Sequence, residues 1–334
     1  QGNTFDFQSI APGSGLYLVA AAGLRLGVLP LHLPYSSESS LRRGFGTSLR
    51  LISAASSLVL LAHIPTESLI TAITPVLVIF AIVASLYGGW MWLRAPDELT
   101  GRPYWIIGFA SLAVISALSG NSIGVVAWGC ALILVGGALF LASVQQTWLN
   151  RVMLIGAWSL SSLPFSLTAS AWIGRLGFFT PFVVAAQALL IAGFIRNTLR
   201  PSGRESLDAG QNWMRTVYPA GIFMLIFFQL LLGLVGWNGA RQMGAWLLAI
   251  IVSFLTFGLV WATPRLRVLN PVRADWEGPG ASSLSNIYQG FWTIYRLFGR
   301  LSQSITDTLE GEGGIMWTLL FLILFISLLT QGIP

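Results

Sequence analysis

Long apolar segments recur along almost the whole chain, and they restrict it to one kind of fold. A helix needs about 20 apolar residues to cross the hydrocarbon core of a bilayer. Only 9% of the 334 residues are charged, against about 25% in an ordinary soluble domain. The sequence therefore predicts an all-α polytopic membrane protein with about ten transmembrane helices, at residues 12–34, 41–64, 67–93, 103–119, 122–148, 152–174, 178–195, 217–236, 243–263 and 315–331.

The arginines predict how these helices are oriented. The chain has no lysine, and with the N-terminus outside, fourteen of its 18 arginines fall on one side of the membrane. Only Arg175 and Arg241 fall on the other side, while Arg25 and Arg50 lie within spans. Because cytoplasmic loops are enriched in Lys and Arg, the arginine-rich side is expected to be cytoplasmic. The net charge of +6 comes from these loops and does not indicate binding to nucleic acid.

Two long cytoplasmic loops predict three regions: a helix bundle at 1–195, further spans and a loop at 196–263, and a C-terminal region at 264–334. The last region carries apolar residues at helical spacing before the final span: Ile287, Phe291, Ile294, Tyr295 and Phe298. This pattern is typical of an amphipathic helix along the membrane surface. We expect it to be a structural strap rather than a binding site.

The chain offers little material for a metal or redox centre. It has one cysteine, Cys130, and two histidines, His32 and His63, and all 12 acids are expected in loops or at span ends. Such a composition predicts no internal disulfide and resembles no haem, flavin or iron–sulfur ligand set, so no cofactor is expected in this chain.

Arg25 and Arg50 are the charges expected inside the membrane. Each lies nine residues from a cytoplasmic span end, about 13 Å at 1.5 Å per residue. Ionisable residues at such depth are functional hypotheses by default. The alternative is that each snorkels or bonds carbonyls freed by a helix break, and His32 is as readily a structural hydrogen-bonder as a proton relay.

Two spans are expected to be broken. Pro30 interrupts the first, and Pro164 lies in the middle of the sixth, where serine and threonine hydroxyls can satisfy the freed carbonyls. Paired broken helices are typical of transporters with sites near the membrane midplane.

Three segments resemble the antiporter-like membrane subunits of respiratory complex I, membrane-bound hydrogenases and Mrp-type cation/proton antiporters. AAAGLRLGVLPLHLPY is similar to the family's first broken helix, with Arg25 at its lysine and Pro30 and His32 in register. TSLRLISAASSLVLLAHI is similar to the following helix, with Arg50 at its lysine, and LIGAWSLSSLPFSLTASAWIGR to the second broken helix, with Arg175 near its terminal Lys or Glu.

The resemblance covers only the family's second half, and it departs at the residues that would carry protons. Gly136 stands where the family's fifth-span pattern has a lysine. Lysine can lower its pKa and exchange protons, whereas arginine is effectively always protonated. The resemblance therefore implies a membrane subunit of a complex I-like redox complex, in a prokaryotic plasma membrane, whose proton path in this half is impaired.

Three hypotheses follow. The first is an antiporter-like scaffold subunit whose partners are the other membrane subunits and the bilayer, and whose redox chemistry is done elsewhere. The second is an active proton or ion path lined by Arg25, His32, Arg50 and the two breaks. The third is an unrelated secondary transporter or a membrane transferase, although the chain lacks the acid, His or Cys cluster expected of an enzyme.

Overall fold

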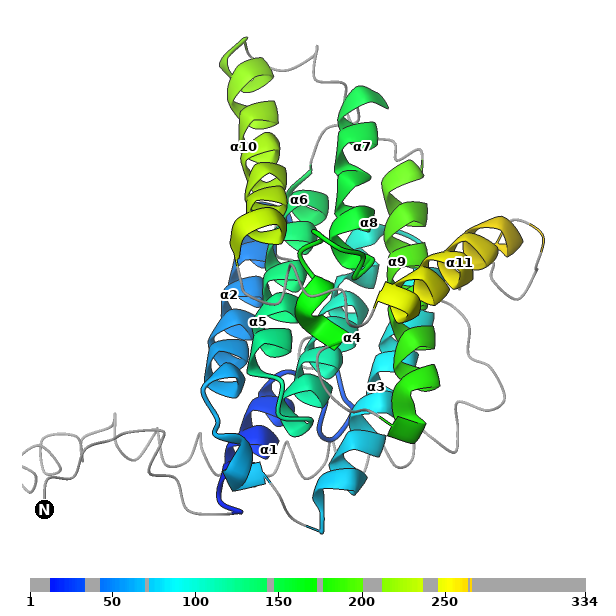
Figure 1. Ribbon diagram of the computed structural model, residues 1–334. Helices are drawn as coiled ribbons and strands as arrows, with labels where there is room; N and C mark the ends of the chain where they lie inside the picture. Colours follow the sequence, from blue (N-terminus) through cyan, green and yellow to red (C-terminus); the bar gives the residue numbers. More distant parts are fainter. Residues whose placement is uncertain are drawn as a thin grey trace, which may run out of the picture. The chain divides into compact units, whose positions relative to one another are not determined.

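The computed structural model describes residues 13–33, 43–69, 72–142, 147–172, 177–200, 212–236, 246–263 and 265. Within these residues the structure is helical and contains no strand. The helices are α1 (Gly15–Arg25), α2 (Arg43–Ala62), α3 (Thr74–Arg94), α4 (Glu98–Leu118), α5 (Ser122–Cys130), α6 (Gly136–Leu141), α7 (Thr147–Met153), α8 (Ile155–Leu160), α9 (Thr180–Leu199), α10 (Asn212–Leu231) and α11 (Trp246–Ala262) (Figure 1). π-helical turns join α5 to α6 (Ala131–Val135) and extend α10 (Leu232–Gly236).

The described residues are all-helical and consistent with a helical membrane protein, as expected, but the number of ten spans is not confirmed. Five helical stretches are long and apolar enough to cross a membrane: Thr74–Arg94, Glu98–Leu118, Ser122–Leu141, Gly177–Leu199 and Arg215–Val235. Three further apolar helices are shorter: Gly15–Arg25, Gly46–Ala62 and Trp246–Ala262. The segment expected at 152–174 forms only the short α8 and a 3₁₀ turn, Ala169–Trp172, besides the end of α7.

The fourth span begins earlier than the sequence pattern predicts. Its expected start was Pro103, yet α4 begins at Glu98, because the Asp97 carboxylate accepts a hydrogen bond from the Thr100 backbone N–H at 2.8 Å and caps the helix. Glu98 and Arg102 therefore belong to the first turns of a buried helix and not to a loop.

The chain divides into two compact units, residues 1–272 and 273–334. All described residues belong to the first. The expected amphipathic helix and the last span, 315–331, lie outside the described residues.

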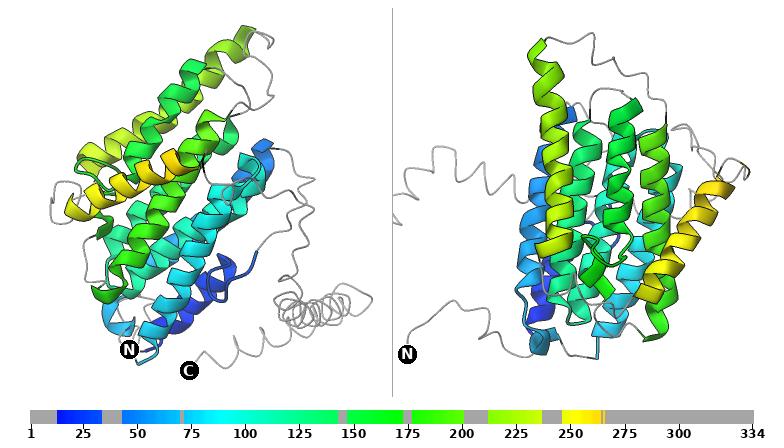
Figure 2. Two further views of the ribbon diagram at one scale, coloured as in Figure 1. Left: turned by 90° about the vertical axis from the view of Figure 1, so that its right-hand side faces the viewer. Right: turned by 45° about the horizontal axis from the view of Figure 1, so that its top comes forward.

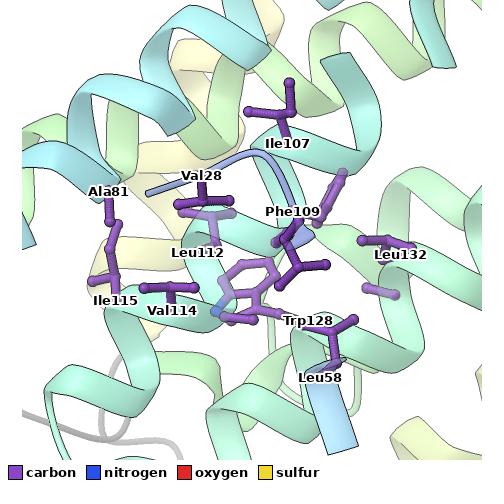
Figure 3. Close-up of a cluster of buried hydrophobic side chains, with 14 of the residues drawn as sticks. Val28, Leu58, Ala81, Ile107, Phe109, Leu112, Val114, Ile115, Trp128 and Leu132 are labelled. Carbon is purple, nitrogen blue, oxygen red and sulfur yellow. The ribbon is translucent and has the colours of Figure 1, made fainter. Parts of the chain in front are cut away.

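α4 is the central helix of the first unit. Its residues are apolar on every face beyond Pro103, which is typical of a helix enclosed by others. It packs against α2, α3, α5 and α9 (Figures 1 and 2). Trp105 of α4 lies among the rings of Trp92, Phe109, Phe140 and Phe194, with a centroid separation of 4.3 Å to Phe109. Further along α4, Phe109 meets Trp128 among aliphatic side chains (Figure 3).

Large apolar side chains cover the outer faces of α2, α3, α10 and α11. On α11, which lies obliquely across α9 (Figure 2), Phe254 and Phe257 are 73% and 70% exposed. Such faces suit contact with lipid or with other membrane helices, where no water has to be excluded.

Candidate functional site

The two arginines expected at one depth lie in different environments. α1 ends at Arg25, whose side chain is exposed. The chain then reverses through Gly27, whose φ of +75° lies in the left-handed region that glycine adopts without strain. The backbone N–H groups of Val28 and Leu29 donate to the Gly23 carbonyl at 2.8 and 3.1 Å, which closes the turn. His32 follows this turn, half-buried, with Nδ1 2.9 Å from the Pro30 carbonyl oxygen.

Arg50 is only 5% exposed, and Thr47 on the same helix and Glu98 and Arg102 of α4 are buried as well. Arg102 is 1% exposed, and its guanidinium donates to the Thr47 hydroxyl at 2.6 Å. Thr47 precedes Arg50 by one turn of α2, and Glu98 precedes Arg102 by one turn of α4. The sequence pattern missed Glu98 and Arg102 because apolar length alone places them outside the span. The Asp97–Thr100 capping pair was the signal that could have found them.

Gly136 occupies the position at which the family resemblance expects a lysine, and this position is closed. A Cβ atom added there would lie 2.6 Å from Nε1 of Trp105 and 3.3 Å from Cε2 of Phe140. The Trp105 indole is held in place because Nε1 donates to the Leu132 carbonyl at 3.3 Å. No side chain fits at this position unless the aromatic cluster moves. Arg175 lies outside the described residues.

The chain around Pro164 is not helical. α8 ends at Leu160, and the next helical turn begins at Ala169. Between them, Ser162 and Phe165 have φ values of +58° and +64°, which cost free energy for any residue other than glycine. Both sides of the proline are thus held in an unfavourable backbone conformation by the surrounding structure.

A network of neutral side chains holds this segment. The Gln187 amide of α9 donates to the Leu160 carbonyl at 2.7 Å and to the Ser162 hydroxyl at 2.8 Å. The Ser162 hydroxyl donates to Thr168 Oγ1 at 3.1 Å, and Thr168 Oγ1 donates to the Ser159 carbonyl at 3.0 Å. The network therefore ties the end of α8, the irregular segment and α9 together.

α10 completes the network from the other side. The Ser159 hydroxyl donates to the Gln229 amide oxygen at 3.3 Å. One turn later, Gly233 lies so close to the irregular segment that an added Cβ would be 2.5 Å from the Phe165 carbonyl oxygen. The sequence pattern missed both glutamines, although each is an amide within an otherwise apolar span, which was the available signal.

Not every buried polar atom of this region is satisfied within the described residues. Those without a hydrogen-bond partner there are Ser166 Oγ, Ser170 Oγ, Gln187 Oε1 and Gln229 Nε2. Such atoms can bond water or another polar guest. Amides and hydroxyls do not change protonation near neutral pH, so these side chains can hold a hydrogen-bonded guest but cannot store a proton. Among the described residues, no three His, Cys, Asp or Glu side chains gather into a metal-binding group.

Replacing Gln187 with leucine is expected to destabilise the protein by about 1–3 kcal/mol, because the Leu160 carbonyl and the Ser162 hydroxyl then lose a buried partner. The midpoint of thermal unfolding in detergent measures the effect. Ser253→Ala is the matched control, because its hydroxyl bonds only the Ala249 carbonyl one turn away at 2.9 Å. Equal midpoints for the two variants would contradict a stabilising role of the network.

In comparisons with known proteins, no family model and no curated protein matches the chain.

Proposed function

We propose that the chain is a membrane-arm subunit of a complex I-like redox complex, of the NADH-quinone oxidoreductase or hydrogenase type. In this proposal it is an antiporter-like subunit with an impaired proton path, and its role is to support neighbouring subunits. The PLH and SLxxLP motifs support the family, and both fall where the chain leaves helical geometry, after Arg25 and after Leu160.

The main support for the proposal is that the space around Gly136 leaves no room for a side chain. A proton relay needs a group that gains and loses a proton, with room for that group and for water. At Gly136 there is no side chain, and Trp105 and Phe140 occupy the space that one would need. The two other lysine positions carry Arg25 and Arg50, and a guanidinium is a poorer proton-exchanging group than an amine. All three positions therefore favour a subunit that does not itself relay protons.

The exposed outer surface of the helices is the basis for proposing that the chain supports neighbouring subunits. Exposed apolar side chains on α10 and α11, such as Phe227 and Phe254, offer faces for neighbouring helices or lipid. In this proposal the N-terminus is outside, the arginine-rich side is cytoplasmic, the membrane is a prokaryotic plasma membrane, and the amphipathic segment within 264–314 braces the partner subunits. Catalysis and cofactors belong to those partners, and nucleic acid is not among them.

An active proton or ion path is the second candidate, and two observations favour it. Arg50 and Arg102 are buried charges, and the segment around Pro164 holds polar atoms able to bond water. This path would need hydration that connects Arg25 and Arg50 with the segment around Pro164. An unrelated secondary transporter is the remaining alternative.

Native mass analysis and cross-linking of the full chain from its own membranes test the first proposal. Co-purification with redox subunits, with cross-links from residues 283–312 to antiporter-like neighbours, is the expected result. A homo-oligomer without redox partners would overturn it and favour an independent transporter.

Substituting Arg25 by lysine in the intact complex tests the impaired path directly. We expect assembly and proton pumping to be unchanged, because Arg25 is exposed and the Gly136 position remains closed. Pumping is measured in sealed vesicles with a pH-sensitive dye, with Arg25→Gln as the control for loss of the charge. A large gain of pumping from Arg25→Lys alone would show that a working path exists.

A further inference from the structure

The ends of α3, α9 and α11 gather four arginines at one corner of the described structure. Arg94 is the last residue of α3, Arg196 and Arg200 lie at the end of α9, and Arg265 follows α11. The three helix ends meet in a small apolar cluster in which Leu93 and Ala192 are fully buried, with Trp90, Leu189, Leu259 and Val260 packed around them. We call these four arginines the arginine corner.

Hydrogen bonds to the backbone hold two of these arginines in place. Arg196 donates to the Leu93 carbonyl, and Arg200 donates to the Pro96 carbonyl and, at 3.2 Å, to that of Ala95. These contacts satisfy carbonyls at the end of α3. They also hold two like charges one turn apart on α9, an arrangement that costs free energy unless an anion is near.

Tryptophan rings position the other two. The Arg94 guanidinium lies 5.6 Å from the centroid of the Trp90 ring, and that of Arg265 lies 3.8 Å from the Trp261 ring. Tryptophan is enriched at the membrane–water interface, at the level of the lipid headgroups. The arginine corner therefore has the composition expected at headgroup depth.

Three arginines of the corner, Arg94, Arg200 and Arg265, have no acidic partner within the described residues. Those residues include three acids: Glu67, Asp97 and Glu98. Asp97 is half-buried and is the acid nearest in sequence to Arg94, and its carboxylate accepts from the Thr100 N–H and hydroxyl, both at 2.8 Å. Arg94, Arg200 and Arg265 form no ion pair in the described part of the chain, so within it their charges are available to a bound anion.

We propose that the arginine corner binds the phosphate of an anionic phospholipid. The planar guanidinium matches phosphate geometry with two parallel hydrogen bonds, and basic pockets between transmembrane helices are typical headgroup sites. The adjoining face of α11 exposes Phe254 and Phe257, so acyl chains can lie beside the same corner. This apolar face favours a lipid over free phosphate. The inference does not depend on the proposed redox partners.

The test uses the full chain purified in a neutral detergent, with phosphatidylglycerol and phosphatidylcholine added separately and binding followed by native mass spectrometry. We expect phosphatidylglycerol to bind at least tenfold more tightly than phosphatidylcholine at low salt, and the difference to shrink as salt rises. The double variant Arg94→Gln/Arg265→Gln should weaken phosphatidylglycerol binding about tenfold. It leaves the Arg196 and Arg200 contacts to α3 intact, so folding is preserved.

Arg151→Gln is the matched control, because Arg151 is an exposed arginine on α7 that does not belong to the arginine corner. Equal binding of the two lipids, or an equal loss in the Arg151 variant and the double variant, would overturn the proposal. Inorganic phosphate that displaces the lipid at equal concentration would also overturn it, since the acyl chains would then contribute nothing.

Discussion

Gly136→Ala is expected to lower the free energy of unfolding by about 1–3 kcal/mol, whereas Gly137→Ala leaves it unchanged or raises it by up to about 1 kcal/mol. The two glycines are neighbours on α6, so helix propensity acts equally on both. A Cβ at Gly136 would lie 2.6 Å from Trp105 Nε1, but one at Gly137 would have its nearest neighbours at 3.8 and 4.0 Å, in ordinary contact. The difference between the two variants therefore measures the tight contact with Trp105.

Thermal unfolding in detergent, followed by fluorescence-detected size exclusion, measures both variants. The same substitution in a Trp105→Phe background provides a second check. The smaller ring leaves room near Gly136, so the loss from Gly136→Ala should shrink by at least about 0.5 kcal/mol. If Gly136→Ala were as harmless as Gly137→Ala, the lysine position would be open, and the argument for an impaired proton path would lose its main support.

Gly233→Ala is expected to cause a loss of about 2–3 kcal/mol, because the atoms it meets belong to the backbone. The added Cβ would lie 2.5 Å from the Phe165 carbonyl oxygen and 3.0 Å from the Leu167 nitrogen. Phe165 already has a φ of +64°, so the segment cannot retreat without further strain. We expect α10 to be pushed away, with loss of the contact between Ser159 and Gln229.

Gly221→Ala on the same helix is the control. Nothing lies within 4 Å of its added Cβ, so alanine should stabilise α10 by up to about 1 kcal/mol through helix propensity. Opposite signs for the two substitutions are the expected result. A neutral Gly233→Ala variant would show that α10 does not press on the segment around Pro164, and that the polar network is open on that side.

Apolar length and proline position predicted part of the site. Pro164 lies in an irregular segment between α8 and Ala169, and the absence of a lysine at Gly136 is plain from the sequence. The start of α4 was predicted wrongly, because a proline was taken as the helix boundary although it lies in the second turn, after the Asp97 cap. Gln187 and Gln229 were missed because a single amide has no spacing pattern, and its importance depends on what it contacts.

By itself, the sequence determined the helical membrane class and the chemistry available within it. Segments this apolar must satisfy their backbone hydrogen bonds internally, and a chain without lysine has no amine to exchange protons. Only the tertiary structure decided which polar groups matter. The sequence places Arg25 and Arg50 at the same expected depth in their spans. In the structure Arg25 is exposed and Arg50 is buried, because burial depends on the neighbouring helices. The same holds for Gly136, which is closed by a tryptophan 31 residues earlier in the chain.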